Sequence, residues 1–184
     1  MGTVDWIVKH AKKNYSSQAK FTTTALAGLL IVIMVPCLFV YLSSLENGKL
    51  SISKHPAFLV IVGIIALCGI SLAFWTIWAQ FHKAQGTPIP IMPTKKLLIN
   101  KPYSYCRNPM ALGTILYYAG ISIIVRSCLS GVVTVAFTSL LIILIKTIEE
   151  KEMTIRFGED YIKYKNATPF LIPFTHCQKK DNIQ

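Results

Sequence analysis

Four uncharged stretches constrain the fold of this chain more than any other feature. Residues 21–45 and 56–81 contain no Asp, Glu, Lys or Arg over 25 and 26 positions, and residues 108–125 and 127–145 contain none over 18 and 19 positions. A helix rises about 1.5 Å per residue, so about 20 residues cross a hydrocarbon core of roughly 30 Å. The first two stretches therefore predict full transmembrane helices. The last two predict a tight helical hairpin that is barely long enough to span.

The composition is typical of a membrane protein and argues against several other classes. The chain has 184 residues, 53% of them hydrophobic, with a mean hydropathy of +0.49. The net charge of +11 is distributed over the polar gaps between the apolar stretches, so no nucleic-acid partner is expected. The five cysteines include no CxxC pair and the four histidines show no ligand spacing, so neither a disulfide framework nor a metal site is expected.

These observations predict an all-α integral membrane protein with four transmembrane helices, or five, and a helical hairpin over residues 108–149. We expect two regions. Residues 1–85 would hold an amino-terminal segment and two transmembrane helices, and residues 86–184 would hold a proline-rich loop, the hairpin and a carboxy-terminal segment. Residues 1–20 are either an interfacial amphipathic helix or a mobile tail.

The distribution of basic residues predicts how the chain is oriented in the membrane. If residues 1–20, 82–107 and 146–184 share one side, that side holds 16 of the 19 Lys and Arg residues. The positive-inside rule then places both termini in the cytoplasm. The same arrangement brings the two most unusual polar segments of the chain to one side.

Two features inside the first apolar stretches predict how those helices pack. Pro36 frees a backbone carbonyl of the preceding turn, which a neighbouring helix can satisfy. Gly63 and Gly69 predict close approach of a second helix, because small residues let backbones pack tightly in lipid.

Two polar segments at the ends of apolar stretches predict a binding site. Residues 101–113 lead from a basic loop into the third stretch, and residues 148–158 follow the fourth stretch with a cluster of acids. The acids are either a solvated helix end paired with Arg156 or Lys146, or they include a carboxylate, Glu149, that receives a cationic group of a ligand.

The start of the third stretch offers the complementary groups. Arg107 and Asn108 supply donors, Pro109 fits the first helical turn, and the positive helix N-terminus favours an anion. A site with one acid for a cation and a donor cluster for an anion matches the headgroup of an amino acid.

The motifs of the second half follow a recognisable order. Pro-Tyr-x-Tyr-x-Arg-Asn-Pro-Met-x-x-Gly at 102–113 precedes the hairpin, Glu-Glu follows at 149–150, and then come Phe-Gly-x-x-Tyr-x-x-Tyr at 157–164 and Pro-x-x-x-Pro at 169–173. This order, over about residues 85–175, resembles the isoprenylcysteine carboxyl methyltransferase and phospholipid N-methyltransferase families. These are integral membrane enzymes that use S-adenosylmethionine and release S-adenosylhomocysteine. The resemblance implies that residues 86–184 are a methyltransferase core with a cytoplasmic cofactor pocket.

The resemblance also implies roles for individual residues. Arg107 is the candidate catalytic residue. The candidate cofactor-binding residues are Lys95 and Leu98 beside the adenine, Tyr103 packed on the cofactor, Asn108, Pro109, Met110 and Ala111 at its amino-acid end, Glu149 on its ammonium, and Glu150. The family usually has His at position 108 and often Tyr at position 111. The substrate-binding Arg of the eukaryotic isoprenylcysteine enzymes falls at Ile145, with Lys146 beside it.

The expected function is S-adenosylmethionine-dependent methyl transfer to a lipophilic acceptor that enters from the surrounding membrane lipids. An isoprenylcysteine-type carboxylate is the first candidate, because the motifs contain no His to act as a base for an amine. A phospholipid or another small lipid amine is the alternative. A nicotinamide-dependent membrane reductase and a non-catalytic membrane scaffold or transporter subunit are the remaining alternatives.

Overall fold

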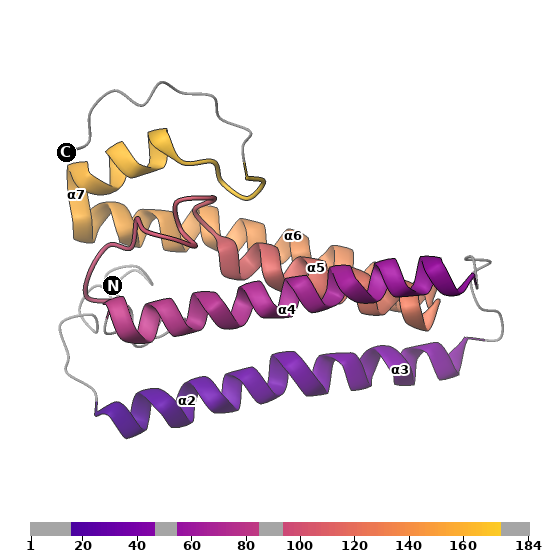
Figure 1. Cartoon of the computed structure of the whole chain (residues 1–184). Helices are drawn as coiled ribbons and strands as arrows, with labels where there is room; N and C mark the ends of the chain where they lie inside the picture. Colours follow the sequence, from indigo (N-terminus) through magenta and orange to yellow (C-terminus); the bar gives the residue numbers. More distant parts are fainter. Residues whose placement is uncertain (1–15, 47–54, 85–93, 174–184) are drawn as a thin grey trace.

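The computed structural model describes residues 16–46, 55–84 and 94–173, and within these ranges the only regular secondary structure is helical. The elements are α2 (Ser17–Leu29), η1 (Leu30–Met34), α3 (Val35–Leu45), α4 (Pro56–Ala84), α5 (Pro109–Val125), α6 (Cys128–Leu144), η2 (Ile145–Glu149) and α7 (Glu150–Ala167), where η marks a π-helical turn. Figure 1 shows the long helices lying side by side, with α7 at one end of the bundle. The predicted all-α fold is confirmed.

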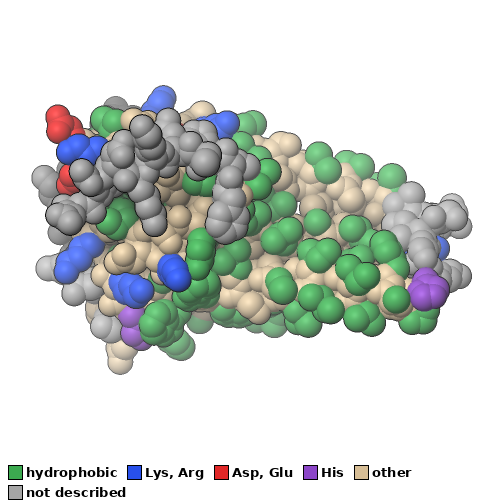
Figure 2. All heavy atoms as spheres, turned by 45° about the horizontal axis from the view of Figure 1, so that its top comes forward, with side chains coloured by type: hydrophobic (Ala, Val, Ile, Leu, Met, Phe, Trp, Pro, Cys, Tyr) green, Lys and Arg blue, Asp and Glu red, His purple; other side chains and the backbone are tan. Residues whose placement is uncertain are grey.

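The described helices match the predicted transmembrane stretches. Three helical runs are long and apolar enough to cross a membrane, Gln18–Leu45, Pro56–Ala84 and Cys128–Ala167, and α5 is a shorter apolar helix. Within the described ranges there is no fifth apolar helix of that kind. Figure 2 shows hydrophobic side chains along most of the length of the helix bundle, while most of the charged side chains in this view lie at the end that carries α7. The predicted helix or tail at residues 1–20 lies mostly outside the described residues.

Helices α4 and α5 pack with their backbones in contact. A Cβ atom added to Gly69 would lie 2.6 Å from the carbonyl oxygen of Gly113, and one added to Gly120 would lie 2.7 Å from the Cβ of Ala66. The predicted close approach at Gly69 is confirmed. The same prediction is wrong for Gly63, because nothing lies within 4 Å of a Cβ placed there.

Pro36 is accommodated by a π-helical turn and by two tyrosines of α5. A residue with an N–H at this position would donate to the carbonyl of Val32 in an α-helix or of Ile31 in a π-helix. The Tyr117 hydroxyl donates to the Val32 carbonyl at 2.9 Å, and the Tyr118 hydroxyl donates to the Ile31 carbonyl at 3.0 Å. A neighbouring helix therefore satisfies the carbonyls freed by the proline, as predicted.

Removing both hydroxyls, as Tyr117→Phe with Tyr118→Phe, is expected to lower the free energy of unfolding by about 1 to 2 kcal/mol, because two carbonyls lose their donors inside the bundle. Equilibrium unfolding in mixed detergent micelles measures this loss. In a Pro36→Ala background the cost should be smaller, since the restored N–H can reach a carbonyl itself. An equal cost in both backgrounds would show that the hydroxyls do not compensate for the proline.

The hairpin turn between α5 and α6 is short, as the predicted tight hairpin requires. Only Arg126, in the left-handed region at φ 57°, and Ser127 separate the two helices. The Ser127 hydroxyl accepts from the Ser130 N–H at 3.0 Å, and the Glu46 carboxylate accepts from the Leu129 N–H at 2.6 Å. The Ser127 hydroxyl and the Glu46 carboxylate thus satisfy N–H groups in the first turn of α6, so the helix can begin directly after Ser127. The contact with Glu46 also links the start of α6 to the end of α3.

Beyond α6 the chain continues as one helical path through η2 into α7 and then reverses at Gly158. This residue has φ 54° and ψ −128°, a conformation that glycine adopts readily and other residues rarely adopt. Figure 1 shows the second arm of α7 folded back over the end of the bundle. The reversal carries Tyr161 and Tyr164 to the loop of residues 94–108, where the Tyr164 hydroxyl donates to the Tyr103 carbonyl at 2.8 Å.

Candidate functional site

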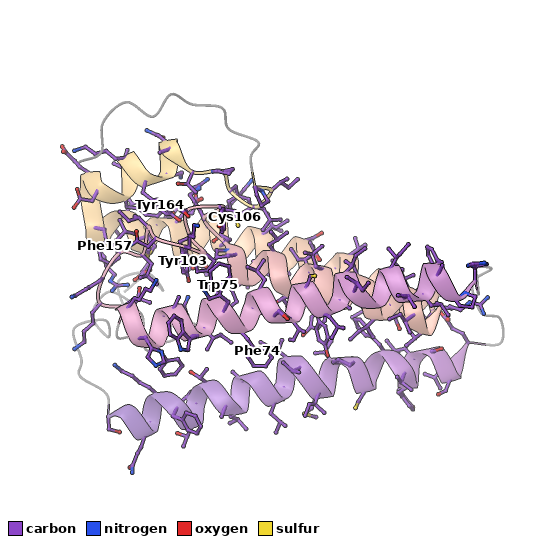
Figure 3. All side chains as sticks on the ribbon, in the orientation of Figure 1. Phe74, Trp75, Tyr103, Cys106, Phe157 and Tyr164 are labelled. Carbon is purple, nitrogen blue, oxygen red and sulfur yellow. The ribbon has the colours of Figure 1, made fainter. Side chains whose placement is uncertain are left out.

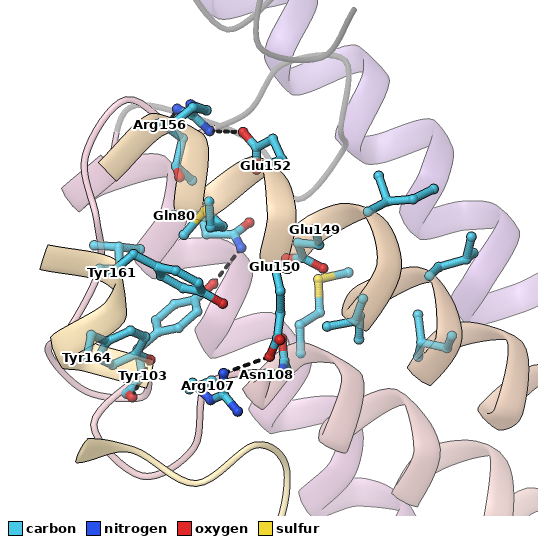
Figure 4. Close-up of a pocket in the computed structure, with 18 of the residues that line it drawn as sticks. Gln80, Tyr103, Arg107, Asn108, Glu149, Glu150, Glu152, Arg156, Tyr161 and Tyr164 are labelled. Atoms are coloured by element: carbon cyan, nitrogen blue, oxygen red, sulfur yellow. Dashed lines mark hydrogen bonds and ion pairs between the residues drawn. The ribbon is translucent and has the colours of Figure 1, made fainter. Parts of the chain in front are cut away.

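A cavity of about 400 Å³ lies where these elements meet, at the end of the bundle that carries α7 (Figure 4). It is large enough for a small organic molecule. Its polar lining residues are Gln80, Thr94, Tyr103, Arg107, Asn108, Glu149, Glu150, Glu152, Arg156, Tyr161 and Tyr164. Its apolar lining residues are Ile31, Leu98, Met110, Leu141, Leu144, Ile145, Ile148 and Met153.

The structure brings most of the sequence-predicted residues to this cavity. Seven of the ten line it: Leu98, Tyr103, Arg107, Asn108, Met110, Glu149 and Glu150. The two polar segments of the sequence, one before α5 and one after α6, therefore do meet at one end of the molecule. The cavity walls do not include Lys95, Pro109 and Ala111. Lys95 is exposed and its N–H donates to the Ala84 carbonyl at 2.8 Å, while Pro109 and Ala111 are buried within the bundle.

The three acids of the cavity differ in their partners. Glu150 accepts from Arg107 at 2.7 Å and from Lys165 at 2.6 Å, and Glu152 forms an ion pair with Arg156. Glu149 has no hydrogen-bond or ion-pair partner among the described residues. The predicted pairing with Arg156 is confirmed for Glu152, whereas Glu150 is paired with Arg107 and Lys165 and not with Lys146. Glu149 lines the cavity without a compensating cation among the described residues.

Some of the predicted hydrogen-bond donors at the start of α5 already donate to other groups of the protein. The Asn108 amide nitrogen donates to the Phe170 carbonyl at 3.0 Å, so one of its two hydrogens is committed. The guanidinium of Arg107 bonds Glu150 and lies 5.6 Å from the Phe170 ring centroid, but its Nε is buried without an acceptor. The N–H groups of Met110 and Ala111 lie in the first helical turn and have no intrahelical acceptor.

A third polar group without a partner belongs to Gln80 of α4. The Gln80 amide nitrogen donates to the Tyr103 hydroxyl at 2.5 Å, while Gln80 Oε1 is buried with no partner. Burial raises the pKa of the Tyr103 hydroxyl well above its ordinary value; the hydrogen bond from Gln80 opposes this shift and the charge of Glu149 adds to it. The phenol therefore stays protonated at neutral pH and is a poor base.

Several lining residues were not among the sequence-predicted site residues. Tyr161 and Tyr164 belong to the Phe-Gly-x-x-Tyr-x-x-Tyr motif, which was used to identify the family but not to assign roles. Gln80 is an amide in an otherwise apolar stretch, and such residues in membrane helices often mark functional sites. Arg156 reaches the cavity because it also donates to the Thr94 carbonyl, a contact that no local pattern indicates.

One comparison with known proteins found a matching family. A family model described as phospholipid methyltransferase matches residues 57–160, which is more than half of the chain. The match starts in α4, upstream of residue 85 where the motif resemblance begins. No curated protein matches the chain. The matched region contains α4, α5, α6 and the first arm of α7, which build most of the cavity, and the chain belongs to the phospholipid methyltransferase family.

Proposed function

We propose that the chain binds S-adenosylmethionine in this cavity and transfers its methyl group to a lipophilic acceptor from the membrane. The observation that carries the proposal is a pair of buried polar atoms without partners around one cavity, Arg107 Nε and Gln80 Oε1. The Glu149 carboxylate, which is solvent-accessible and has no partner among the described residues, lines the same cavity. Buried polar groups are normally hydrogen-bonded, so unpaired ones that line a cavity point to a ligand with matching groups.

The amino-acid end of the cofactor fits the wall formed by η2 and α5. Glu149 would hold its ammonium, since the other two acids are already neutralised by cations. Arg107 Nε and the N–H group of Met110 in the first turn of α5 would hold its carboxylate, with the helix N-terminus favouring the negative charge. In this proposal Arg107, the candidate catalytic residue, binds the cofactor and positions Glu150.

The adenosine end fits the remaining lining of the cavity. Leu98 and Met153 provide apolar surface, Tyr103 and Tyr161 provide rings, and the Gln80 amide provides a polar group that can meet a ring nitrogen or a ribose hydroxyl. If the Gln80 amide were turned by 180°, its nitrogen would be the unpaired atom, so a polar contact is required in either orientation.

Bound S-adenosylmethionine supplies an electrophilic methyl group on a sulfonium sulfur, and the protein supplies position and environment. The cavity residues would hold the cofactor in one orientation, and the apolar residues of α6 and η2 would exclude water from the reacting groups. We also propose that this end of the bundle faces the cytoplasm, as the distribution of Lys and Arg indicates.

Two acceptor classes remain, and a different observation favours each. A carboxylate of the isoprenylcysteine type is favoured by the absence of a free base among the described cavity residues: Glu150 and Glu152 are paired, Tyr103 is protonated and Glu149 is assigned to the ammonium. A phospholipid amine is favoured by the description of the family model. Such an amine would have to reach the cavity in its neutral form.

Thermal unfolding of the detergent-solubilised full chain tests the cofactor. S-adenosylhomocysteine at about 100 times its Kd should raise the Tm by roughly 5 to 10 °C, because a ligand that binds only the folded state stabilises it. NADPH should leave the Tm unchanged. A shift with NADPH alone would favour a reductase, and no shift with either ligand would favour a non-catalytic protein.

Transfer of a labelled methyl group then separates the acceptors. Farnesylated cysteine with a free carboxylate and vesicles that contain phosphatidylethanolamine are offered to the same protein preparation. Label in a base-labile ester of farnesylcysteine supports the carboxylate, and label in the lipid headgroup supports the amine. A cofactor-binding protein that labels neither would contradict both acceptor classes.

A further inference from the structure

A second cavity, of about 730 Å³, lies between α2 and α4. We call it the α2–α4 groove. Its lining residues are Phe21, Thr24, Ala25, Gly28, Leu29, Val32, Ile33, Phe74, Ile77, Trp78, Phe81 and His82. Figure 3 shows Phe74 pointing from α4 toward α2. The groove does not overlap the cofactor cavity, and the lining of the two cavities shares no residue.

The first helical run is poorly covered by the rest of the protein. Only 6% of its most apolar window is buried, compared with 22% for the window in α4. Exposed apolar side chains of α2 and η1 include Phe21, Leu26, Leu29 and Ile33. In a bilayer such surface contacts lipid, so the occupant with direct access to the groove is a membrane lipid.

One polar group inside the groove has no partner in the protein. The hydroxyls of Thr22 and Thr23 both donate to the carbonyl of Ala19 in the preceding turn. The Thr24 side chain is only 9% exposed and lines the groove, yet its hydroxyl makes no hydrogen bond. A buried hydroxyl in apolar surroundings requires an acceptor, and the ester carbonyl of a glycerolipid is such an acceptor at the boundary of the hydrocarbon.

The charges at one end of the groove select the headgroup. Phe21 and His82 line this end, and the exposed Lys83 follows His82 in the sequence. Helix α4 contains no acid. Figure 2 shows Lys and His side chains beside hydrophobic ones at this end of the molecule. An exposed lysine on a helix without an acid complements an anionic phosphate headgroup.

We propose that the α2–α4 groove binds an anionic glycerophospholipid of the bilayer. The apolar walls hold an acyl chain, Thr24 donates to an ester carbonyl, and Lys83 faces the headgroup. This lipid is a resident ligand and does not depend on methyl transfer. The consecutive residues Ile31 and Val32 line the cofactor cavity and the groove respectively.

Native mass spectrometry of the detergent-solubilised full chain tests this site, with phosphatidylglycerol and phosphatidylcholine added in equal amounts. The wild type should retain one phosphatidylglycerol in preference to phosphatidylcholine. Gly28→Leu places a side chain into the groove, where a Cβ meets nothing within 4 Å, and should abolish retention. Thr24→Val keeps the shape and removes the donor, so it should weaken binding about fivefold. Lys83→Gln should reduce the preference for the anionic lipid.

Matched controls distinguish the groove from general lipid contact. Gly63→Leu, on α4 outside both cavities, and Thr22→Val, at an exposed position of α2, should retain the lipid as the wild type does. Retention by Gly28→Leu at wild-type level would overturn the site, and equal retention of the two lipids would overturn the anionic headgroup. A second copy of the chain that is bound by the wild type and lost in Gly28→Leu would assign the groove to a protein partner instead.

Discussion

Replacing Glu149 with glutamine is expected to weaken the binding of S-adenosylhomocysteine by roughly 10- to 100-fold. The substitution keeps the shape of the side chain but removes the negative charge that would face the ammonium of the ligand. A hydrogen bond to a charged group contributes about 1.5 to 3 kcal/mol, and each 1.4 kcal/mol changes an affinity about tenfold. Calorimetry with the detergent-solubilised full chain measures the two affinities.

Glu159 provides the matched control for this variant. It lies on α7 beyond the reversal at Gly158, it is exposed, and it does not line the cavity. Glu159→Gln should therefore bind the ligand as the wild type does. Unchanged affinity in Glu149→Gln, while the wild type still binds, would remove Glu149 from the site and leave the cofactor with a different binding mode.

Gly113→Ala is expected to lower the free energy of unfolding by roughly 3 kcal/mol, at the upper end for an overpacked interior. The added Cβ would lie 2.5 Å from the carbonyl oxygen of Gly69 and 2.9 Å from the backbone nitrogen of Ala73. Both are backbone atoms of α4, so no flexible side chain can move aside and the helices must separate. Because α5 begins with cavity residues such as Met110, ligand affinity should fall as well. Unfolding in mixed micelles and calorimetry measure the two effects.

Two other glycines separate this steric effect from the general effect of adding a methyl group. Gly63 on α4 and Gly131 on α6 have nothing within 4 Å of an added Cβ. Alanine at either position should leave the stability unchanged or slightly higher, since alanine favours a helix more than glycine does. A Gly113→Ala variant as stable as these controls would mean that α4 and α5 do not approach as closely as the structure shows.

The membrane helices could be predicted because hydropathy is a property of contiguous residues. An uncharged stretch such as 56–81 predicts a helix without reference to the rest of the chain. Pro36 likewise predicts which backbone carbonyls of the preceding turn lose their N–H donor. Which glycines contact another helix could not be read in the same way. Gly63 and Gly69 lie on one helix in similar surroundings, but only Gly69 faces α5, because the facing side depends on where the partner helix packs.

The site could be predicted in outline for a similar reason. The motif around Arg107 and the acids after α6 are both local, and the distribution of basic residues places them on one side of the membrane. The family resemblance implies cofactor-binding roles for Lys95, Pro109 and Ala111, but none of them lines the cavity: Lys95 is exposed, and Pro109 and Ala111 are buried within the bundle. A motif gives the spacing of residues along the chain but not the direction of each side chain.

The sequence by itself determined that this chain is helical and apolar enough to cross a membrane, and that a donor-rich segment and an acidic segment belong together. Only the tertiary structure decided which acid remains unpaired. Glu150 is satisfied by Arg107, which is 43 residues away in sequence, and by Lys165, which reaches it because the chain reverses at Gly158. The pairing of charges depends on distances in space, and the Gly158 conformation sets the one between Lys165 and Glu150.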